Sequence, residues 1–391
     1  MTLRVVHVIA EFSGHEAMGR TVTETAQRVP GEHFLITTAA HDGTDVFAGV
    51  TELGGAVETF PMGRREALDS ALRAWRPDIV HLHGGALAPL FAGRTGIPSF
   101  ANLMTMYAWP TLPSPRRLRS GGLKAALQSN VLRPRVAATT VVPPALVRRA
   151  LRRAGTHTVL TPDPRVLDRL RGMDVRRLGS GAPVDPRRAQ RSSSAPVVLF
   201  AGRAESVRGI DALLDCFPLV LKAVPDARLR LLLIPRPELD GLLAKAHAAG
   251  LGDHLDVVTE PVSDLLGEMA SAQAGAWPFK YDYTTSPPAM AAAEALSVGL
   301  PTVATDVSCL RAVVEDGVNG MVVPPSSPSA LAAALVELLR HEALWKRYAD
   351  AGPITVTRRL GWDQMAATTS AAYDAVLESA SPRLPVEPPA A

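Results

Sequence analysis

Apolar runs alternate with stretches of helical periodicity along most of the chain, and this alternation predicts strands that are each followed by a helix. In the amino half, near-continuous apolar runs typical of parallel strands covered on both faces fall at residues 3–9, 33–38, 79–82, 98–104 and 159–161. A loop with Gly14 and Gly19 follows the first run, and a helix is expected from about Thr21. The carboxyl half repeats the pattern, with strands expected at 196–200, 228–234, 255–258, 274–278, 302–305 and 321–323, and helices at 209–224, 238–249, 329–339 and 364–377.

Two alternating series of similar size predict an α/β protein with two doubly wound, Rossmann-like domains that face a cleft. Ligands are then expected at the carboxyl ends of the strands. The expected bounds are residues 1–186 for the amino domain, 187–195 for a polar linker, 196–353 for the carboxyl domain, 354–379 for a C-terminal helix and 380–391 for a disordered, Pro-rich tail.

Composition narrows the class of protein only a little. The chain has 391 residues, 47% of them hydrophobic, with a formal net charge of +3, which is a normal soluble profile. Its two cysteines are too few for a disulfide framework or a cysteine metal site. No apolar run approaches the roughly 20 residues that span a membrane, and the amino terminus has no signal-peptide pattern, so we expect a cytoplasmic protein.

The segment 286–306 carries the first indication of chemistry. Ser286 suits a helix N-cap, and Pro287 and Pro288 suit a first helical turn, where backbone N–H groups have no partner. Glu294 stands among alanines, and a carboxylate there is either exposed or held by a partner, because an isolated buried charge is costly. A helix N-terminus attracts anions. These features together predict a bound nucleotide, with its phosphates at the helix N-terminus and its hydroxyls on Glu294.

Three segments of the carboxyl half resemble the retaining, nucleotide-sugar-dependent glycosyltransferases of family 4, which have the GT-B fold. They are LFAGRAESVRGIDALL at 199–214, SPPAMAAAEALSVGLPTVATD at 286–306 and VVEDGVNGMVVPPSSPSALAAAL at 313–335. Weaker similarity covers RPDIVHLHGG at 76–85 and LGSGAPVDP at 178–186. The resemblance also implies that the C-terminal helix returns to the amino domain.

The resemblance assigns roles to five positions. Arg203 and Arg208 match the two cations that grip the donor diphosphate, and Glu294 matches the glutamate that binds the ribose hydroxyls. Gly19 matches the glycine that lets backbone approach the diphosphate from the other domain. Ser286 stands where the family has its first glutamate, and this departure leaves the donor sugar open. From the residues alone, the two arginines could instead be solvated and Glu294 could face water.

The implied reaction is retaining transfer from a nucleotide-diphosphate donor, taken as a UDP-sugar, to a hydroxyl of a natural product, a lipid-linked sugar or a polysaccharide. Arg203, Arg208 and the helix N-terminus near Ser286 and Pro287 would stabilise the charge on the leaving diphosphate. The chain has no Asp-x-Asp motif of the kind that holds a metal ion on a sugar nucleotide, so neither a metal nor another cofactor is expected. The alternatives are a sugar-nucleotide epimerase or phosphorylase on the same fold, and a non-catalytic partner, which Ser286 motivates.

The amino half offers weaker candidates. Glu11, Arg20 and His83 are candidates for the acceptor cleft, and Arg20 could also reach the phosphates. Surface exposure is the competing interpretation for Glu11. His81 and His83 flank Leu82 at a strand end, but a metal site would need more ligands. Packing of one of them in the core is therefore favoured.

A basic zone extends over residues 116–153 and is interspersed with leucine and valine. Its charges are Arg116, Arg117, Arg119, Lys124, Arg133, Arg135, Arg148, Arg149, Arg152 and Arg153. A solvated Arg-rich face is the favoured interpretation, and peripheral contact with the inner face of an anionic membrane stays open. Nucleic-acid binding is not expected, because aromatic residues make up 5% of the chain and no nucleic-acid module is visible.

Overall fold

The computed structural model describes residues 2–14, 17–54, 65–84, 97–103, 143–178, 181–183, 185–191, 195–281, 284–285 and 287–380. The chain divides into two compact units. The first combines Met1–Pro110, Pro134–Gly179 and Asp363–Ala391, and the second is Ser180–Trp362 in its described part. Each unit is built on a parallel sheet with helical connections, which confirms the predicted fold class of two doubly wound domains. The cleft between them stays a prediction.

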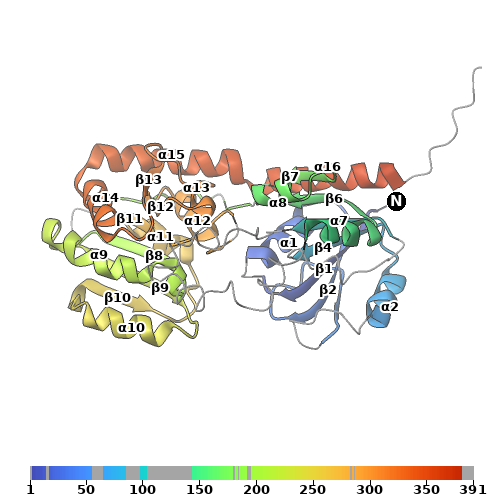
Figure 1. The fold of residues 1–391 in the computed structure, drawn as a ribbon, viewed down its shortest axis with the longest axis horizontal. Coiled ribbons are helices and arrows are strands. Elements are labelled where there is room, and N and C mark those ends of the chain that lie inside the picture. Colours follow the sequence, from blue (N-terminus) through green and yellow to red (C-terminus); the bar gives the residue numbers. More distant parts are fainter. Residues whose placement is uncertain are drawn as a thin grey trace, which may run out of the picture. The chain divides into compact units, whose positions relative to one another are not determined.

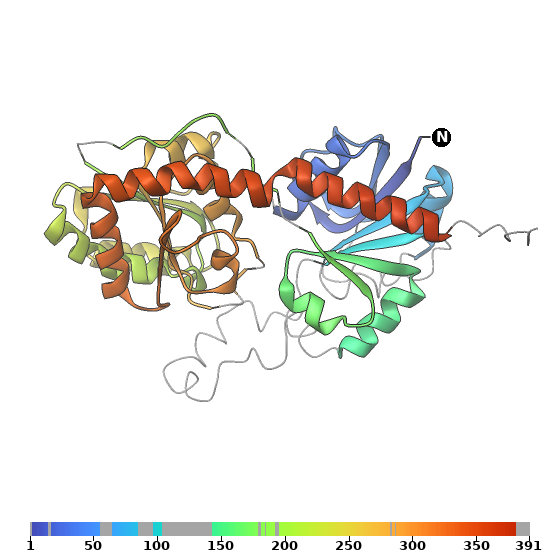
Figure 2. The same ribbon diagram turned by 90° about the horizontal axis from the view of Figure 1, so that it is seen from above.

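The first unit holds a seven-stranded sheet in the order β3-β2-β1-β4-β5-β6-β7. Its strands are β1 (Arg4–Phe12), β2 (Glu32–Ala40), β3 (Gly49–Glu52), β4 (Ile79–Gly84), β5 (Ser99–Leu103), β6 (Thr156–Thr161) and β7 (Asp174–Arg177). Its helices are α1 (Ala17–Arg28), α2 (Arg65–Trp75), α7 (Pro144–Arg153), α8 (Pro164–Arg169) and α16 (Trp362–Ala380). Figure 1 shows these elements, and Figure 2 shows α16 lying along this unit.

The two faces of the first sheet are packed differently. One face is largely apolar and packs against α2 and α7, through residues such as Val6, Val8, Leu68, Val147 and Leu151. Side chains alternate between the faces of a strand, so the opposite face takes the residues in between. That face joins Ile9, Phe12, Val22, Leu35 and Phe47 under α1, and it also carries the buried polar residues His7, His33, His81, His83 and Asn102.

The second unit holds a six-stranded sheet in the order β10-β9-β8-β11-β12-β13. Its strands are β8 (Val197–Arg203), β9 (Arg228–Ile234), β10 (Leu255–Val258), β11 (Ala274–Trp277), β12 (Thr302–Thr305) and β13 (Gly320–Val323). Its helical elements are η4 (Ser206–Arg208), α9 (Ile210–Ala223), α10 (Leu239–Ala248), η5 (Gly252–His254), α11 (Leu265–Ser271), α12 (Met290–Ser297), α13 (Ser308–Arg311), α14 (Pro328–Arg340) and α15 (Glu342–Leu360).

A single apolar core fills the second unit. Trp277 is fully buried in it, and its indole Nε1–H donates to the Ala201 carbonyl at 3.2 Å. A Cβ on Gly352 would lie 2.7 Å from the Leu296 carbonyl oxygen, so glycine lets α15 pack directly on α12. The buried face of α12 is therefore covered by helix as well as by sheet.

Several predicted bounds differ from the structure. The first helix begins at Ala17 rather than near Thr21. Most of the helix α15 was not predicted, because Pro353 in its interior argues locally against a helix, and only residues 354–360 fall in the predicted C-terminal helix 354–379. The predicted domain bound at 353/354 falls inside α15, whereas the change of unit comes after Trp362.

The segment predicted as a free linker is bound to the second unit over its described residues. The Ala189 amide donates to the Val298 carbonyl at 2.6 Å, and Arg191 donates to the Leu339 carbonyl at 2.8 Å. The polar composition of residues 187–191 therefore does not indicate an unattached segment, because hydrogen bonds from Ala189 and Arg191 attach it to the second unit.

Candidate functional site

The predicted donor-binding residues of the second unit follow two neighbouring strands. The strand order reverses between β8 and β11, and ligands of doubly wound folds bind at such a switch point, beyond the carboxyl ends of the strands. Arg203 ends β8 and Arg208 ends η4 just after it, while α12 with Glu294 follows β11. Topology thus brings the predicted donor residues to one edge of one sheet.

Arg208 is held against an aromatic ring. Its guanidinium carbon lies 4.9 Å from the centroid of Phe279, and its Nε is 3.6 Å from Glu205 Oε2. Burial lowers the pKa of Arg208, the nearby Glu205 carboxylate acts in the opposite direction, and the charge of Arg203 lowers it further. The charges of Arg203 and Arg208 therefore act on each other.

The turn that carries Arg208 requires a glycine after it. Gly209 has φ of 75°, and a Cβ there would lie 1.8 Å from the Pro278 carbonyl oxygen. Lys280 closes the same turn, since its amide donates to the Val207 carbonyl at 3.0 Å and its Nζ lies 2.6 Å from Asp211 Oδ2. The turn at residues 207–209 is thus fixed by backbone contacts with the chain that leaves β11.

Glu294 is 4% exposed on α12 and lies among buried alanines. The expected capping differs: α12 begins at Met290 with Ala289 as its N-cap, and no side chain caps it. Pro287 and Pro288 precede the helix and are joined by a cis peptide bond. The helix begins after both prolines because a residue before proline is disfavoured in the α region. Ser286 lies outside the described residues.

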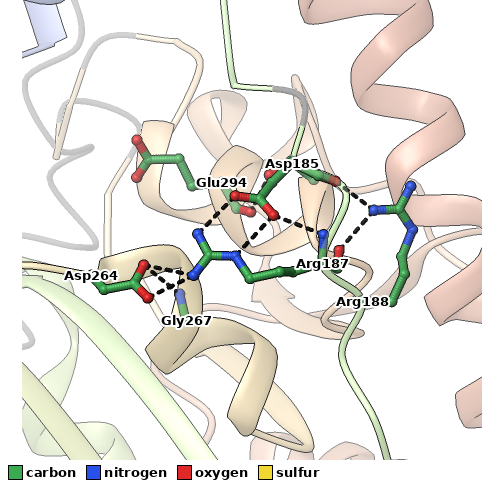
Figure 3. Close-up of polar contacts among 7 residues, drawn as sticks. Asp185, Arg187, Arg188, Asp264, Gly267 and Glu294 are labelled. Carbon is green, nitrogen blue, oxygen red and sulfur yellow. Dashed lines mark hydrogen bonds and ion pairs between the residues drawn. The ribbon is translucent and has the colours of Figure 1, made fainter.

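An arginine network that no sequence pattern indicated anchors the start of the second unit (Figure 3). Arg187 donates to Asp185 Oδ2 at 2.7 Å and to Asp264 Oδ2 at 2.6 Å. Asp264 also caps α11 by accepting from the Gly267 amide at 3.0 Å. Hydrogen bonds from Arg187 lower the pKa of both carboxyl groups. Figure 3 shows the Glu294 carboxylate pointing away from this network.

The first unit has its own switch point, between β1 and β4. Gly19 is buried in the first turns of α1, and a Cβ there would lie 1.8 Å from the Ser13 carbonyl oxygen. Close packing of the loop on α1 thus requires this glycine, apart from any ligand. Asp42, which the sequence analysis missed, accepts from the Ser13 hydroxyl at 3.1 Å and from the Gly14 amide.

The acceptor candidates are spread over different environments. Glu11 is exposed on β1, and its Oε1 lies 3.0 Å from His41 Nε2. Arg20 is half-buried on α1. His83 is 2% exposed, so it does not line an open surface of the described residues.

His83 instead belongs to a buried histidine cluster, formed by His7, His33, His81 and His83. Its Nε2 lies 2.9 Å from His7 Nδ1, and His7 Nε2 lies 2.9 Å from His33 Nδ1. Burial lowers the pKa of all four histidines, that of His83 to about 3. The expectation that one of the pair His81 and His83 packs inside is thus exceeded, since both are buried.

The basic zone is described only from residue 143 onward, and its part before that lies outside the described residues. On α7, Arg149, Arg152 and Arg153 are exposed, and Leu146 is 52% exposed beside them. Arg148 donates to the Arg169 carbonyl at 3.0 Å. Within the described chain, no helix combines the length and apolarity needed to cross a membrane.

Residues 195–341 match the family described as glycosyl transferases group 1. A phosphatidyl-myo-inositol mannosyltransferase of Mycobacterium leprae is 32% identical over 222 residues, which cover 54% of this chain and 56% of that protein. The match therefore spans about half the length of this curated relative.

Solved structures show the fold. Sucrose-phosphate synthase from Thermosynechococcus elongatus superposes with a TM-score of 0.75 at 17% identity, covering 97% of this chain and all of that one. An Anabaena protein solved with UDP and glucose gives a TM-score of 0.68 at 15% identity, covering 95% of this chain and all of that one. Residues 195–341 are therefore similar to the glycosyl transferases of group 1, and the two Rossmann-like domains are those of the GT-B fold.

Proposed function

We propose that this chain is a retaining glycosyltransferase that moves a sugar from a nucleoside-diphosphate donor, taken as a UDP-sugar, to a hydroxyl of a lipid-linked or inositol-containing acceptor. The observation that carries the proposal is that the cations Arg203 and Arg208 and the buried carboxylate of Glu294 stand on segments that follow neighbouring strands at one switch point. The family match of residues 195–341 supports the same assignment.

The donor's diphosphate would bind to the two arginines. Arg208 is held over Phe279 before any ligand arrives, so little side-chain freedom is lost on binding. The planar guanidinium offers parallel N–H donors to phosphate oxygens. Glu294 would accept hydrogen bonds from the ribose hydroxyls.

Transfer would follow from charge stabilisation. As the bond between the anomeric carbon and the diphosphate oxygen breaks, negative charge grows on the leaving phosphate, and the arginines stabilise it. The leaving phosphate oxygen takes the proton of the acceptor hydroxyl, whose oxygen forms the new bond on the same face. No side-chain base is required, and we propose that transfer itself uses no metal ion.

Support for a UDP donor comes from the Anabaena neighbour, which was solved with UDP. Support for an inositol-lipid acceptor comes from the name of the mycobacterial relative. A lipid acceptor would present its head group at a membrane surface, and we propose that α7 contacts that surface. Arg149 and Arg153 are four residues apart and exposed, so they share one helix face.

Nucleotide-induced thermal stabilisation tests the donor site. UDP, GDP, ADP and dTDP are each added to the full chain, and UDP should give the largest shift. Glu294→Gln should weaken UDP binding by about 10- to 100-fold, because a hydrogen bond to a charged group is lost. Arg203→Ala should weaken it similarly. The matched controls are Glu337→Gln and Arg228→Ala, which change exposed residues of the same unit.

The outcomes separate the alternatives. No shift with any nucleotide would contradict the donor site. Binding of UDP without turnover of any UDP-sugar would favour the non-catalytic partner, and release of an epimerised UDP-sugar would favour the epimerase.

Vesicle sedimentation tests the membrane contact. The chain should sediment with anionic vesicles and less so with zwitterionic ones, because each basic residue near an anionic surface contributes about 1 kcal/mol. The double variant Arg149→Glu, Arg153→Glu should release it, while Arg311→Glu, an exposed change in the second unit, should not. Equal sedimentation of the double variant would contradict the role of α7.

A further inference from the structure

The histidine cluster of the first unit is a polar site inside a sheet core. His7 on β1 and His81 on β4 are register partners, and His83 lies two residues further along β4 on the same face. These three are 0%, 1% and 2% exposed. One ring nitrogen from each lies within 4.8 Å of the others. The donor site proposed above uses none of them.

The hydrogen bonds fix the proton positions in this cluster. His33 Nε2 lies 2.8 Å from the Val29 carbonyl, which can only accept, so Nε2 carries the hydrogen and Nδ1 is an acceptor. His7 must therefore donate from Nε2 to His33 Nδ1, which leaves a lone pair on His7 Nδ1. Neutral rings are consistent with burial, which lowers the pKa of each histidine.

Two further nitrogens of the cluster have no hydrogen-bond partner in the described chain. They are His81 Nε2 and His83 Nδ1. His81 Nδ1 lies 2.6 Å from the Tyr373 hydroxyl, so His81 can hold its proton on Nδ1 and direct a lone pair from Nε2. A buried polar atom without a partner costs about 1–3 kcal/mol, which means that the site as described is incomplete.

Asn102 adds to the same deficit. It is 1% exposed on β5, its register partner is His83, and neither its amide oxygen nor its amide nitrogen has a partner among the described residues. If His83 moves its proton from Nε2 to Nδ1, the Nε2 lone pair becomes free. The amide oxygen of Asn102, on the neighbouring strand β5, is an acceptor of the right kind for the proton on His83 Nδ1.

We infer that His7, His81 and His83 bind one divalent transition-metal ion of the zinc class, through His7 Nδ1, His81 Nε2 and His83 Nε2. Neutral imidazole nitrogens suit Zn²⁺, whose Zn–N distances of about 2.0–2.1 Å place tetrahedral ligands about 3.3 Å apart. The distance between His7 Nδ1 and His83 Nε2, now 2.9 Å, would lengthen slightly around the ion. The distances from His81 to the other two rings would shorten.

The surroundings supply the orienting partners that metal-bound histidines use. Ligating histidines hold their other nitrogen in a hydrogen bond that fixes the tautomer. His33 does this for His7, and Tyr373 does it for His81. Because Tyr373 lies on α16, the ion would tie that helix to the sheet, a structural role that leaves sugar transfer to other residues.

The experiment measures metal uptake by the full chain after removal of metal with a chelator. Zn²⁺ should bind at one ion per chain in competition with a chromophoric chelator, and Co²⁺ should give the visible absorption of a tetrahedral nitrogen site. His81→Gln and His83→Gln should abolish both signals. Tyr373→Phe keeps the ring and should weaken Zn²⁺ binding by about 10- to 100-fold.

The control is His41→Gln, which changes an exposed histidine of the same unit and should leave uptake unchanged. Circular dichroism shows which variants fold. If His81→Gln and His83→Gln do not fold, Tyr373→Phe carries the test. Two results together would overturn the inference: the wild type takes up no more Zn²⁺ than Tyr373→Phe, and bound Co²⁺ shows octahedral absorption. Water would then be the partner of the buried nitrogens. Nucleotide binding is measured separately, so failure here leaves the proposed function standing.

Discussion

The two sheets share the order 3-2-1-4-5-6 over their first six strands, yet they place polar groups in opposite ways. In the second unit the strands at the switch point are apolar up to their ends. Arg203 is the last residue of β8, and Arg208 and Glu294 come after the strands. In the first unit, His7 and His81 stand inside β1 and β4, in the core itself. A shared topology thus offers two places for polar chemistry, the rim of the sheet and its interior.

The difference matters because the two places impose different requirements. A polar group at the rim can be completed by a soluble ligand such as a nucleotide, which arrives and leaves. A polar group in the interior must find a partner on folding, because desolvation without a hydrogen bond is costly. The rim therefore suits turnover, and the interior suits a permanent partner.

The largest expected effect breaks the apolar core of the second unit. Trp277→Ala should lower the free energy of unfolding by about 3–5 kcal/mol, since it empties a fully buried aromatic site. Urea unfolding followed by circular dichroism measures it. Trp362→Ala offers a comparison at the edge of the unit, where the ring covers Gly181. A change below that of Trp362→Ala would show that the core is not concentrated around Trp277.

A smaller effect is expected from the polar interior of the first unit. His33→Leu removes the acceptor of the His7 Nε2–H and should cost about 1–3 kcal/mol, the price of a buried donor left without a partner. The control is His254→Leu, which removes one hydrogen bond to Ala227 at the surface of the second unit and should cost about 0.5–1.5 kcal/mol. Equal losses of unfolding free energy in the two variants would show that breaking the buried histidine hydrogen bonds costs no more than breaking a hydrogen bond at the surface.

Alkaline pH should destabilise the core of the second unit through Cys216. Burial raises the pKa of Cys216 from 9.0 to about 12. A raised pKa stabilises the fold below the unfolded value, and this contribution is lost as pH rises from about 9 towards 12. Urea unfolding at several pH values should show this loss, and Cys216→Ala should flatten it. An unchanged slope in the variant would assign the loss to another group.

The smallest effect is expected at the exposed Arg187 network. Arg187→Gln should leave the midpoint of thermal unfolding at pH 7 nearly unchanged, because solvent-exposed ion pairs contribute little. Because the pKa values of Asp185 and Asp264 are lowered in the folded chain, the two carboxylates stabilise the fold at pH values above the ordinary pKa of Asp. This stabilisation is lost as the pH falls through the lowered pKa values. The difference between variant and wild type should therefore shrink in acid, and a large loss at pH 7 would show a stronger anchor than the geometry implies.

Local sequence patterns predicted much of the second unit. The strand at 228–234 and the helix at 329–339 fall within a residue of β9 and α14, because hydrophobic periodicity reports the local backbone directly. Most of the helix α15 was not predicted, because Pro353 is a local signal against helix. Packing on α12 overrides that signal. The consecutive prolines 287 and 288 were placed inside α12, although each proline disfavours helix in the residue before it.

The sequence by itself determined the alternation of buried strands and helices and the fold class, because these depend on short-range patterns. Its resemblance to a known family singled out Arg203, Arg208 and Glu294, whose role as a donor site stays a prediction. The tertiary structure decided the interior of the first unit. His7 is 26 residues from His33 and 76 from His83, and His81 meets Tyr373 across 292 residues. No local period records such distances. Sheet order and the return of α16 set them, so a pair of histidines with no visible further ligand became a buried cluster.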